Sequence, residues 1–241
     1  MGLGLGLGAS SSSYMSMDLK DATTALALWL KNGAGVAAAQ WDDSSGNDNH
    51  AAQSTTGNQA GVSDGGLDFE EDNEDHYDLT SMVTVAENGG FCIAWVMDTE
   101  SATNNSLVSD SGAETIRIQN ASKIRLLTND PGNLQSAYHT DEAFGANKGL
   151  YMLNRTAGDG SEVTIFKNGA AVAIEASSGD STLADAGEND NGFTFDTIGA
   201  ANSGGTHFFD GKLLELAFWT KSLSAQEIAD VNSYLKSIHG L

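Results

Sequence analysis

The sequence has very little positive charge. Lysine and arginine number 11 against 33 aspartate and glutamate residues, which gives a formal net charge of −22. This charge repels phosphate backbones and anionic lipid headgroups, and no run of basic residues offers a local exception. We therefore expect neither nucleic acid nor a membrane surface as a partner. The same acidity suits saline or calcium-rich surroundings, in which cations screen the repulsion.

Cysteine chemistry and familiar catalytic motifs are also missing. Cys92 is the only cysteine, so no internal disulfide can form, and its apolar neighbours predict a thiol packed in the core. The sequence has no G-x-S-x-G elbow, no H-x-x-x-H or C-x-x-C pair and no glycine-rich phosphate loop. Single histidines, each expected in a loop or on the surface, are His50, His76, His139, His207 and His239. These absences predict a protein that is not an enzyme.

Proline is almost absent, whereas glycine is abundant. With 28 glycines and one proline, short apolar runs alternate with clusters of Ser, Asn and Asp, which predicts many short strands and few helices. In the run 91–97, large side chains alternate with smaller ones, as in a strand buried on both faces. The turn 167–169 reads Lys-Asn-Gly and predicts a tight hairpin, because Asn and Gly tolerate positive φ. A second hairpin is expected to join 116–118 to 124–126.

The C-terminal residues predict a helix. Ser224 and Glu227 have the spacing of a capping box, so the helix should begin at about Ala225, and Gly240 suits a left-handed C-terminal cap. Apolar residues recur at helical spacing between these caps, at Ile228, Val231, Leu235 and Ile238.

The strand 208–219, together with this helix start, resembles the closing segment of laminin-G-like domains in the concanavalin A-like lectin/glucanase superfamily. Other segments follow the order of that family, namely 26–30, 43–50, 66–69, 91–96 and 163–169. The resemblance implies an all-β fold, a two-sheet antiparallel jelly-roll sandwich with one short C-terminal helix. We expect one domain over 19–241 and an extended arm over 1–18. The expected core includes Phe91, Ile93, Trp95, Ile165, Leu214, Leu216 and Phe218.

Enzymes among the relatives of this fold carry E-x-D-x-E on one strand, which places their carboxylates on one face. The only dense acidic stretch here, 68–78, does not alternate with apolar residues, so its acids would not be directed together into a cleft. Matching it to the family indicates a solvated loop that enters a strand at Tyr77. The alternative is a cation site, since clustered carboxylates with asparagine bind hard cations.

Structural calcium is the one cofactor that the sequence suggests, because many sandwiches of this superfamily hold one. Oxygen ligands from two loops would suit its flexible geometry. The candidate ligands are Asp42, Asp43, Asn47, Asp48 and Asp210. The alternative is an Asx-rich turn that satisfies its own backbone, and on balance we expect no tightly held ion.

Carbohydrate binding is the commonest function of the non-catalytic members of the superfamily, and it normally uses exposed aromatic rings. Trp29, Trp95 and Trp219 stand in apolar strand contexts and are expected in the core. The candidates for an exposed glycan contact are therefore Trp41 and Tyr138.

The first residues alternate leucine with glycine. This segment has no cationic start, so it is not expected to be a secretory signal. In an extended arm, Leu3, Leu5 and Leu7 would share one side and could bury against a neighbouring subunit. Such an opening resembles those of structural proteins from marine tailed bacteriophages. The alternative is a flexible leader.

Three classes of function remain: a non-catalytic virion protein of a tailed phage, an adhesion module that binds host-surface glycans, and a glucanase-like hydrolase. The missing export signal favours the first. The lack of repeats and heptads favours a capsid decoration protein or a head or tail fibre component over a long tail fibre. We expect a protein that assembles in the host cytoplasm, is exposed on the particle and contacts other virion proteins and copies of itself.

Overall fold

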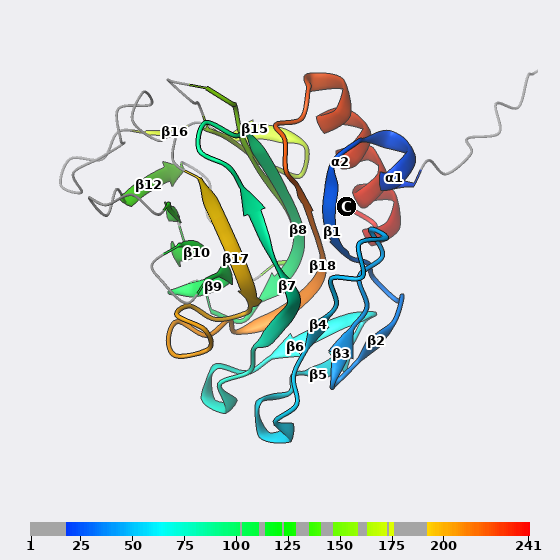
Figure 1. Cartoon of the computed structure of the whole chain (residues 1–241), viewed down its shortest axis with the longest axis vertical. Helices are drawn as coiled ribbons and strands as arrows, with labels where there is room; N and C mark the ends of the chain where they lie inside the picture. The colour runs from blue at the N-terminus through cyan, green and yellow to red at the C-terminus, as the bar shows by residue number, and fades with distance from the viewer. Residues whose placement is uncertain are drawn as a thin grey trace, which may run out of the picture.

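The computed structural model shows two antiparallel β-sheets that face each other as a sandwich (Figure 1), which confirms the predicted all-β jelly-roll fold. Lys123 and the strands 135–140 and 174–175 are described by their backbone alone. The residues that the structure describes are 18–101, 103–110, 114–121, 123–128, 135–140, 147–158, 163–172, 174–175 and 192–241.

The first sheet has eight strands in the order β15-β14-β13-β8-β18-β6-β5, and β1 pairs with the far end of β18. Its strands are β1 (Leu26–Leu30), β5 (Gly61–Ser63), β6 (Gly66–Phe69), β8 (Phe91–Thr99), β13 (Gly149–Arg155), β14 (Val163–Lys167), β15 (Ala170–Val172) and β18 (Gly211–Trp219).

The second sheet has ten strands in the order β16-β12-β11-β10-β9-β17-β7-β4-β3-β2. Its strands are β2 (Val36–Ala37), β3 (Gln40–Trp41), β4 (Ala51–Ala52), β7 (Tyr77–Val85), β9 (Asn105–Ser109), β10 (Thr115–Asn120), β11 (Lys123–Leu127), β12 (Gln135–Thr140), β16 (Ile174–Glu175) and β17 (Phe193–Ile198). The helices are α1 (Leu19–Ala22) and α2 (Ala225–His239), with short 3-10 turns η1 (Thr56–Asn58) and η2 (Glu71–Asn73).

The main core lies between the two sheets. Along β8, Phe91, Ile93 and Trp95 belong to the intersheet cluster, whereas Cys92 and Ala94 belong to the cluster under the helices. The alternation of large and small side chains predicted for this strand is therefore confirmed. Burial raises the pKa of the Cys92 thiol, so the group stays protonated and packs as a small apolar side chain.

All seven residues predicted for the core are buried. Leu214 lies on the helix side of its sheet rather than between the sheets, because the register of β18 against β8 shifts between Leu213 and Glu215. Both predicted hairpins are present as well. Asn168 and Gly169 have φ of 50° and 88° in the turn between β14 and β15, and β10 pairs antiparallel with β11.

Helix α2 has the predicted caps and covers the outer face of the eight-stranded sheet, alongside α1 (Figure 1). Both bonds of the capping box between Ser224 and Glu227 are present, and Gly240 ends the helix with φ of 68°. Ile238 is 50% exposed, and His239 is buried in its place. No helix in the described part of the chain is long and apolar enough to cross a bilayer.

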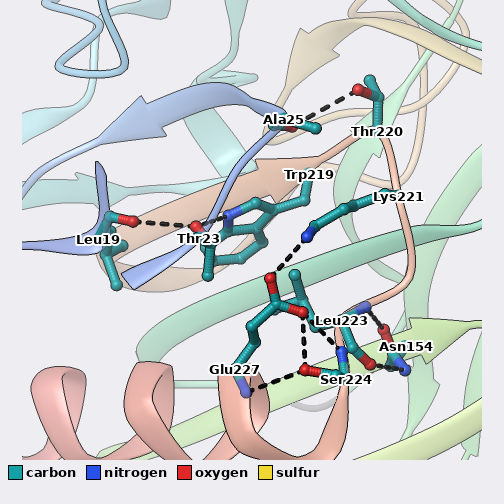
Figure 2. Close-up of polar contacts among 10 residues, drawn as sticks. All are labelled: Leu19, Thr23, Ala25, Asn154, Trp219, Thr220, Lys221, Leu223, Ser224 and Glu227. Atoms are coloured by element: carbon teal, nitrogen blue, oxygen red, sulfur yellow. Dashed lines mark hydrogen bonds and ion pairs between the residues drawn. The ribbon is translucent and has the colours of Figure 1, made fainter. Parts of the chain in front are cut away.

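Polar contacts fix the approach to α2, as Figure 2 shows. The side chain of Asn154 accepts a hydrogen bond from the Leu223 amide at 2.8 Å and donates one to the Leu223 carbonyl at 3.2 Å. The Trp219 indole donates to the Thr23 hydroxyl at 2.6 Å, which ties β18 to the end of α1. With both helices on one sheet, no helix of the described chain covers the outer face of the ten-stranded sheet (Figure 1).

Candidate functional site

The candidate site lies on the outer face of the ten-stranded sheet, where β10 and β11 form an antiparallel pair. Ile116 and Ile118 of β10 belong to the intersheet core, so alternation turns Arg117 to the outer face. On β11 the same alternation turns Arg125 outward, between the buried side chains of Ile124 and Leu126. The two arginines therefore share the outer face of the sheet.

Arg117 and Arg125 lie directly opposite each other in the register of β10 and β11. Side chains at such paired positions have their Cβ atoms about 5 Å apart, and like charges there destabilise the pairing. Arg117 is only 7% exposed, and its buried Nε has no hydrogen-bond partner. Burial, with the charge of Arg125 as a second cause, lowers the pKa of Arg117.

A turn before β18 supplies the rim of the site. Ala201 and Thr206 form an isolated bridge, and the side-chain amide of Asn202 donates to the Thr206 hydroxyl at 3.1 Å. The carbonyl of His207 accepts a hydrogen bond from the Ser106 amide at 3.1 Å, which anchors the turn to β9. Burial lowers the pKa of His207, and the charges of the two arginines lower it further, so the imidazole is neutral near pH 7.

Together these elements enclose a hollow of about 240 Å³. It is lined by Thr115, Arg117, Arg125, Leu127, Ala201, Asn202 and His207. None of these lining residues carries a carboxylate. Guanidinium and imidazole groups beside a small apolar wall can bind a polar anion, and none of the described lining residues is an acid that could donate a proton.

In the predicted calcium loop, the carboxylate of Asp43 is already engaged in hydrogen bonds within the protein. The carboxylate of Asp43 accepts from the Trp29 amide at 2.9 Å, from the Ser45 amide at 2.8 Å and from the Asn49 amide at 3.0 Å. It also accepts from the Ser45 hydroxyl at 2.7 Å. This arrangement is the Asx-rich turn that the sequence offered as the alternative.

The other predicted calcium ligands do not join Asp43. Asn47 donates its side-chain amide to the carbonyls of Leu26 and Ala27, Asp48 has φ of 55°, and Asp42 accepts from Gln40. Within the described ranges no group of three His, Cys, Asp or Glu side chains could hold a metal ion.

Asp210 lies at the opposite end of β18 from this loop. Its neighbour Gly211 pairs with Phe69, whereas Trp29, which bonds to the loop, pairs with Ala217. These two points on β18 are about 20 Å apart at the usual rise of a strand. A single site that includes Asp210 and the loop is therefore wrong.

The prediction that Trp41 is an exposed glycan contact is wrong. Its side chain is fully buried in the intersheet core, and its indole donates to the Lys31 carbonyl at 3.0 Å. Tyr138 lies in β12, where its backbone pairs with Ile124, but its side chain lies outside the described residues. Leu3, Leu5 and Leu7 of the predicted arm also lie outside them.

The acidic stretch is mostly a solvated loop, as predicted, and β7 begins at Tyr77. Asp75 differs, because it is 1% exposed and its carboxylate accepts from the Glu70 amide at 2.9 Å. His239, expected at the surface, is also buried. Its Nε2 lies 2.6 Å from the carboxylate of Glu215, which also accepts from the Trp29 indole at 2.7 Å.

Several solved structures share this fold at low identity. The binding domain of Paraclostridial mosquitocidal protein 1 aligns with a TM-score of 0.57 at 15% identity, over 90% of this chain and 53% of that one. A Trypanosoma rangeli sialidase, solved with 2,3-difluoro-KDN, aligns with a TM-score of 0.54 at 14% identity, over 90% of this chain and 33% of that one. The chain thus spans about half of the first protein and a third of the second.

No curated protein matches the sequence. A family model does: residues 71–229 match Laminin_G_3, described as the concanavalin A-like lectin/glucanases superfamily. The match covers strands of both sheets and the start of α2. The chain belongs to the concanavalin A-like lectin/glucanase superfamily.

Proposed function

We propose that this chain is a non-catalytic glycan-binding module that holds its ligand in the hollow between Arg117, Arg125 and His207. The observation that carries the proposal is this hollow, which opens on the sheet face that no described helix covers. Leu127 and Ala201 offer an apolar wall to the C–H face of a sugar, and the polar groups beside them can bind its substituents. The mosquitocidal protein that shares the fold is itself named as a binding domain.

The chemistry of the lining favours binding over hydrolysis. Most glycoside hydrolases place two carboxylic acids on either side of the scissile bond, about 5 to 10 Å apart. Among the residues that the structure describes, the lining of this hollow contains two arginines and a histidine but no acid. We therefore propose that a bound glycan leaves unchanged.

A glycan array with the labelled full chain tests this function. We expect binding to a subset of glycans, and ligand titration should shift the NMR signals of Thr115, Leu127 and His207. The groove between α2 and the β14–β15 hairpin is the internal control, so signals of Ala229 and Ser233 should stay in place. Shifts confined to that groove, or no bound glycan, would reject the proposal. Release of reducing ends from a bound glycan would reject its non-catalytic part.

We further propose that the module is a structural component of a tailed bacteriophage particle, as capsid decoration or a head or tail fibre component. The alternating leucines at Leu3, Leu5 and Leu7 support this, because one side of an extended arm could bury against another virion protein at about 25 cal/mol per Å². The net charge of −22 supports solubility of a protein displayed in many copies.

A mass-spectrometric inventory of purified particles tests this role, and the protein should be present in it. Deleting 1–13 should leave a folded protein that no longer joins particles. Absence from the particles would remove the virion role, and wild-type incorporation of the truncated chain would remove the anchoring role of the arm. Light scattering should show that the full chain self-associates and that the chain lacking 1–13 does not.

A further inference from the structure

We infer that the hollow is selective for acidic sugars, that is, for a glycan residue whose single negative charge, on a carboxylate or a sulfate ester, lies between Arg117, Arg125 and His207. The inference rests on the proposed glycan-binding function and specifies its ligand class. It starts from the placement of positive charge in a chain that has little of it.

Other cations of the described chain have partners, which are acids for the two lysines below and, for the buried Arg155, the Gly89 carbonyl and the Phe91 ring. Lys212 lies 2.7 Å from the carboxylate of Asp64, and Lys221 pairs with Glu227 in the capping region. Arg117 differs, because no hydrogen bond or ion pair joins it to another described residue, although 33 acids are available in the sequence.

Burial makes this position costly in the absence of a ligand. Arg117 is more than nine-tenths buried, its Nε is unpartnered, and the register of β10 and β11 holds Arg125 directly opposite. A buried donor without an acceptor and two facing like charges both destabilise a fold. One anionic group placed between the guanidinium groups relieves both effects, since a planar guanidinium can donate two parallel hydrogen bonds to a carboxylate or sulfate.

The size and surroundings of the hollow restrict what carries that anion. At about 240 Å³ it is smaller than the sites that hold drug-sized ligands, so it suits one sugar residue rather than a chain segment. The net charge of −22 repels an anion increasingly as the charge of the anion grows. A small anionic sugar therefore fits better than a polyanion such as nucleic acid.

Matched sugars test the inference on the full chain. Glucuronate and glucose differ in one carboxylate, and glucose 6-sulfate carries the alternative anion, so NMR titration with each separates the charge from the sugar. We expect glucuronate or the sulfate to bind at least tenfold more tightly than glucose, with an affinity that falls as salt rises. The stronger of the two anionic sugars identifies the source of the charge.

Substitution then assigns the charge to the site. Arg117→Gln should abolish the preference for the acidic sugar, and Arg117→Lys should retain part of it. Lys236→Gln is the matched control, because it removes one positive charge outside the hollow and should leave the preference intact. Should Arg117→Gln fail to fold, the ligand-induced shifts of the Arg117 and Arg125 guanidinium signals in the unmodified chain provide the same assignment.

The outcomes separate this inference from the proposed function. Equal binding of glucose and glucuronate in the hollow would overturn the acidic preference and leave the glycan-binding function standing. Binding of no sugar or glycan at all would overturn both. An acidic preference that survives Arg117→Gln but is lost in Lys236→Gln would place the anion elsewhere and overturn the inference.

Discussion

The protonation of His207 depends on the two arginines beside it. Burial, followed by the charges of Arg117 and Arg125, lowers the pKa of the histidine. The native state therefore binds the proton of His207 less readily than the unfolded chain does. The neutral form of His207 contributes fully to the free energy of unfolding above the pKa of the unfolded chain, about 6.5. This contribution is lost as the pH falls through that value toward the lower pKa of His207 in the folded state. Near neutral pH, the hollow thus contains two positive charges and an uncharged imidazole.

Ligand binding should reverse this shift. A negative charge between the arginines offsets their repulsion of the imidazolium, so glucuronate should raise the pKa of His207, and its binding should tighten as the pH falls. NMR titration of the imidazole signals with and without glucuronate measures the change. The signals of Ala229 and Ser233, which line the groove beside α2, are the control and should not respond to glucuronate. An unchanged His207 titration at saturating ligand would contradict the placement of the anion.

Trp95 supports a prediction about packing. Its side chain is fully buried and stacks on Tyr151 with ring centroids 5.7 Å apart. Replacing it with alanine leaves a large cavity in the intersheet core, so Trp95→Ala should lower the free energy of unfolding by about 3–5 kcal/mol. Denaturant unfolding measures this loss. Met82→Ala, at a position 49% exposed on β7, should change stability by no more than about 0.5 kcal/mol, and a similar effect of both would contradict the core assignment.

The stability of helix α2 depends on the hydrogen bonds of its first turn. The Ser224 hydroxyl accepts from the Glu227 amide at 3.3 Å, and the Glu227 carboxylate accepts from the Ser224 amide at 2.8 Å. Ser224→Ala removes the first bond, so it should destabilise the protein by about 1 kcal/mol. Ser233→Ala, at an exposed position within the same helix, should be neutral or slightly stabilising, because alanine has the higher helix propensity. Equal melting temperatures for the two variants would argue against the cap.

The elements that could be predicted from the sequence are those whose signals are local. The capping box, the Asn-Gly turn and the alternation along 91–97 each lie within a few residues, and the structure confirms all three. The prediction that Trp41 is exposed is wrong, because its burial depends on short strands at a sheet edge that place it over the core, and no local sequence pattern indicates this pairing.

The candidate site could not be predicted in the same way. Arg117 and Arg125 each stand between apolar residues, and this pattern indicates that both face outward. Their apposition, however, depends on the strand register, and the hollow depends on a turn that follows β17 far along the chain. The sequence predicts a surface position for His207, because nothing near it in the sequence indicates that the two arginines are its neighbours. Sites assembled from distant segments require the fold before they can be recognised.

For the molecule as a whole, the effect of salt screening on stability has to be distinguished from the effect of a bound metal ion. With a net charge of −22 the native state repels itself, so added salt of any kind should raise the melting temperature by screening. Burial, followed by nearby carboxylates of which Glu100 is the first, raises the pKa of Glu70, so this corner of the molecule gains stability as the pH falls. If added calcium salt also changes the ionic strength or the pH, either effect alone could raise the melting temperature and be mistaken for calcium binding.

A specific ion would behave differently, because a ligand that binds only the native state adds stability according to its own concentration and affinity. The carboxylate of Asp43 is already engaged by backbone amides and the Ser45 hydroxyl, so the loop is complete without a cation. We therefore expect excess chelator at constant ionic strength to leave the melting temperature unchanged. Calcium and magnesium should raise it equally. A fall on chelation that calcium alone restores would show a bound ion and would return Asp43 and its neighbours to the role of ligands.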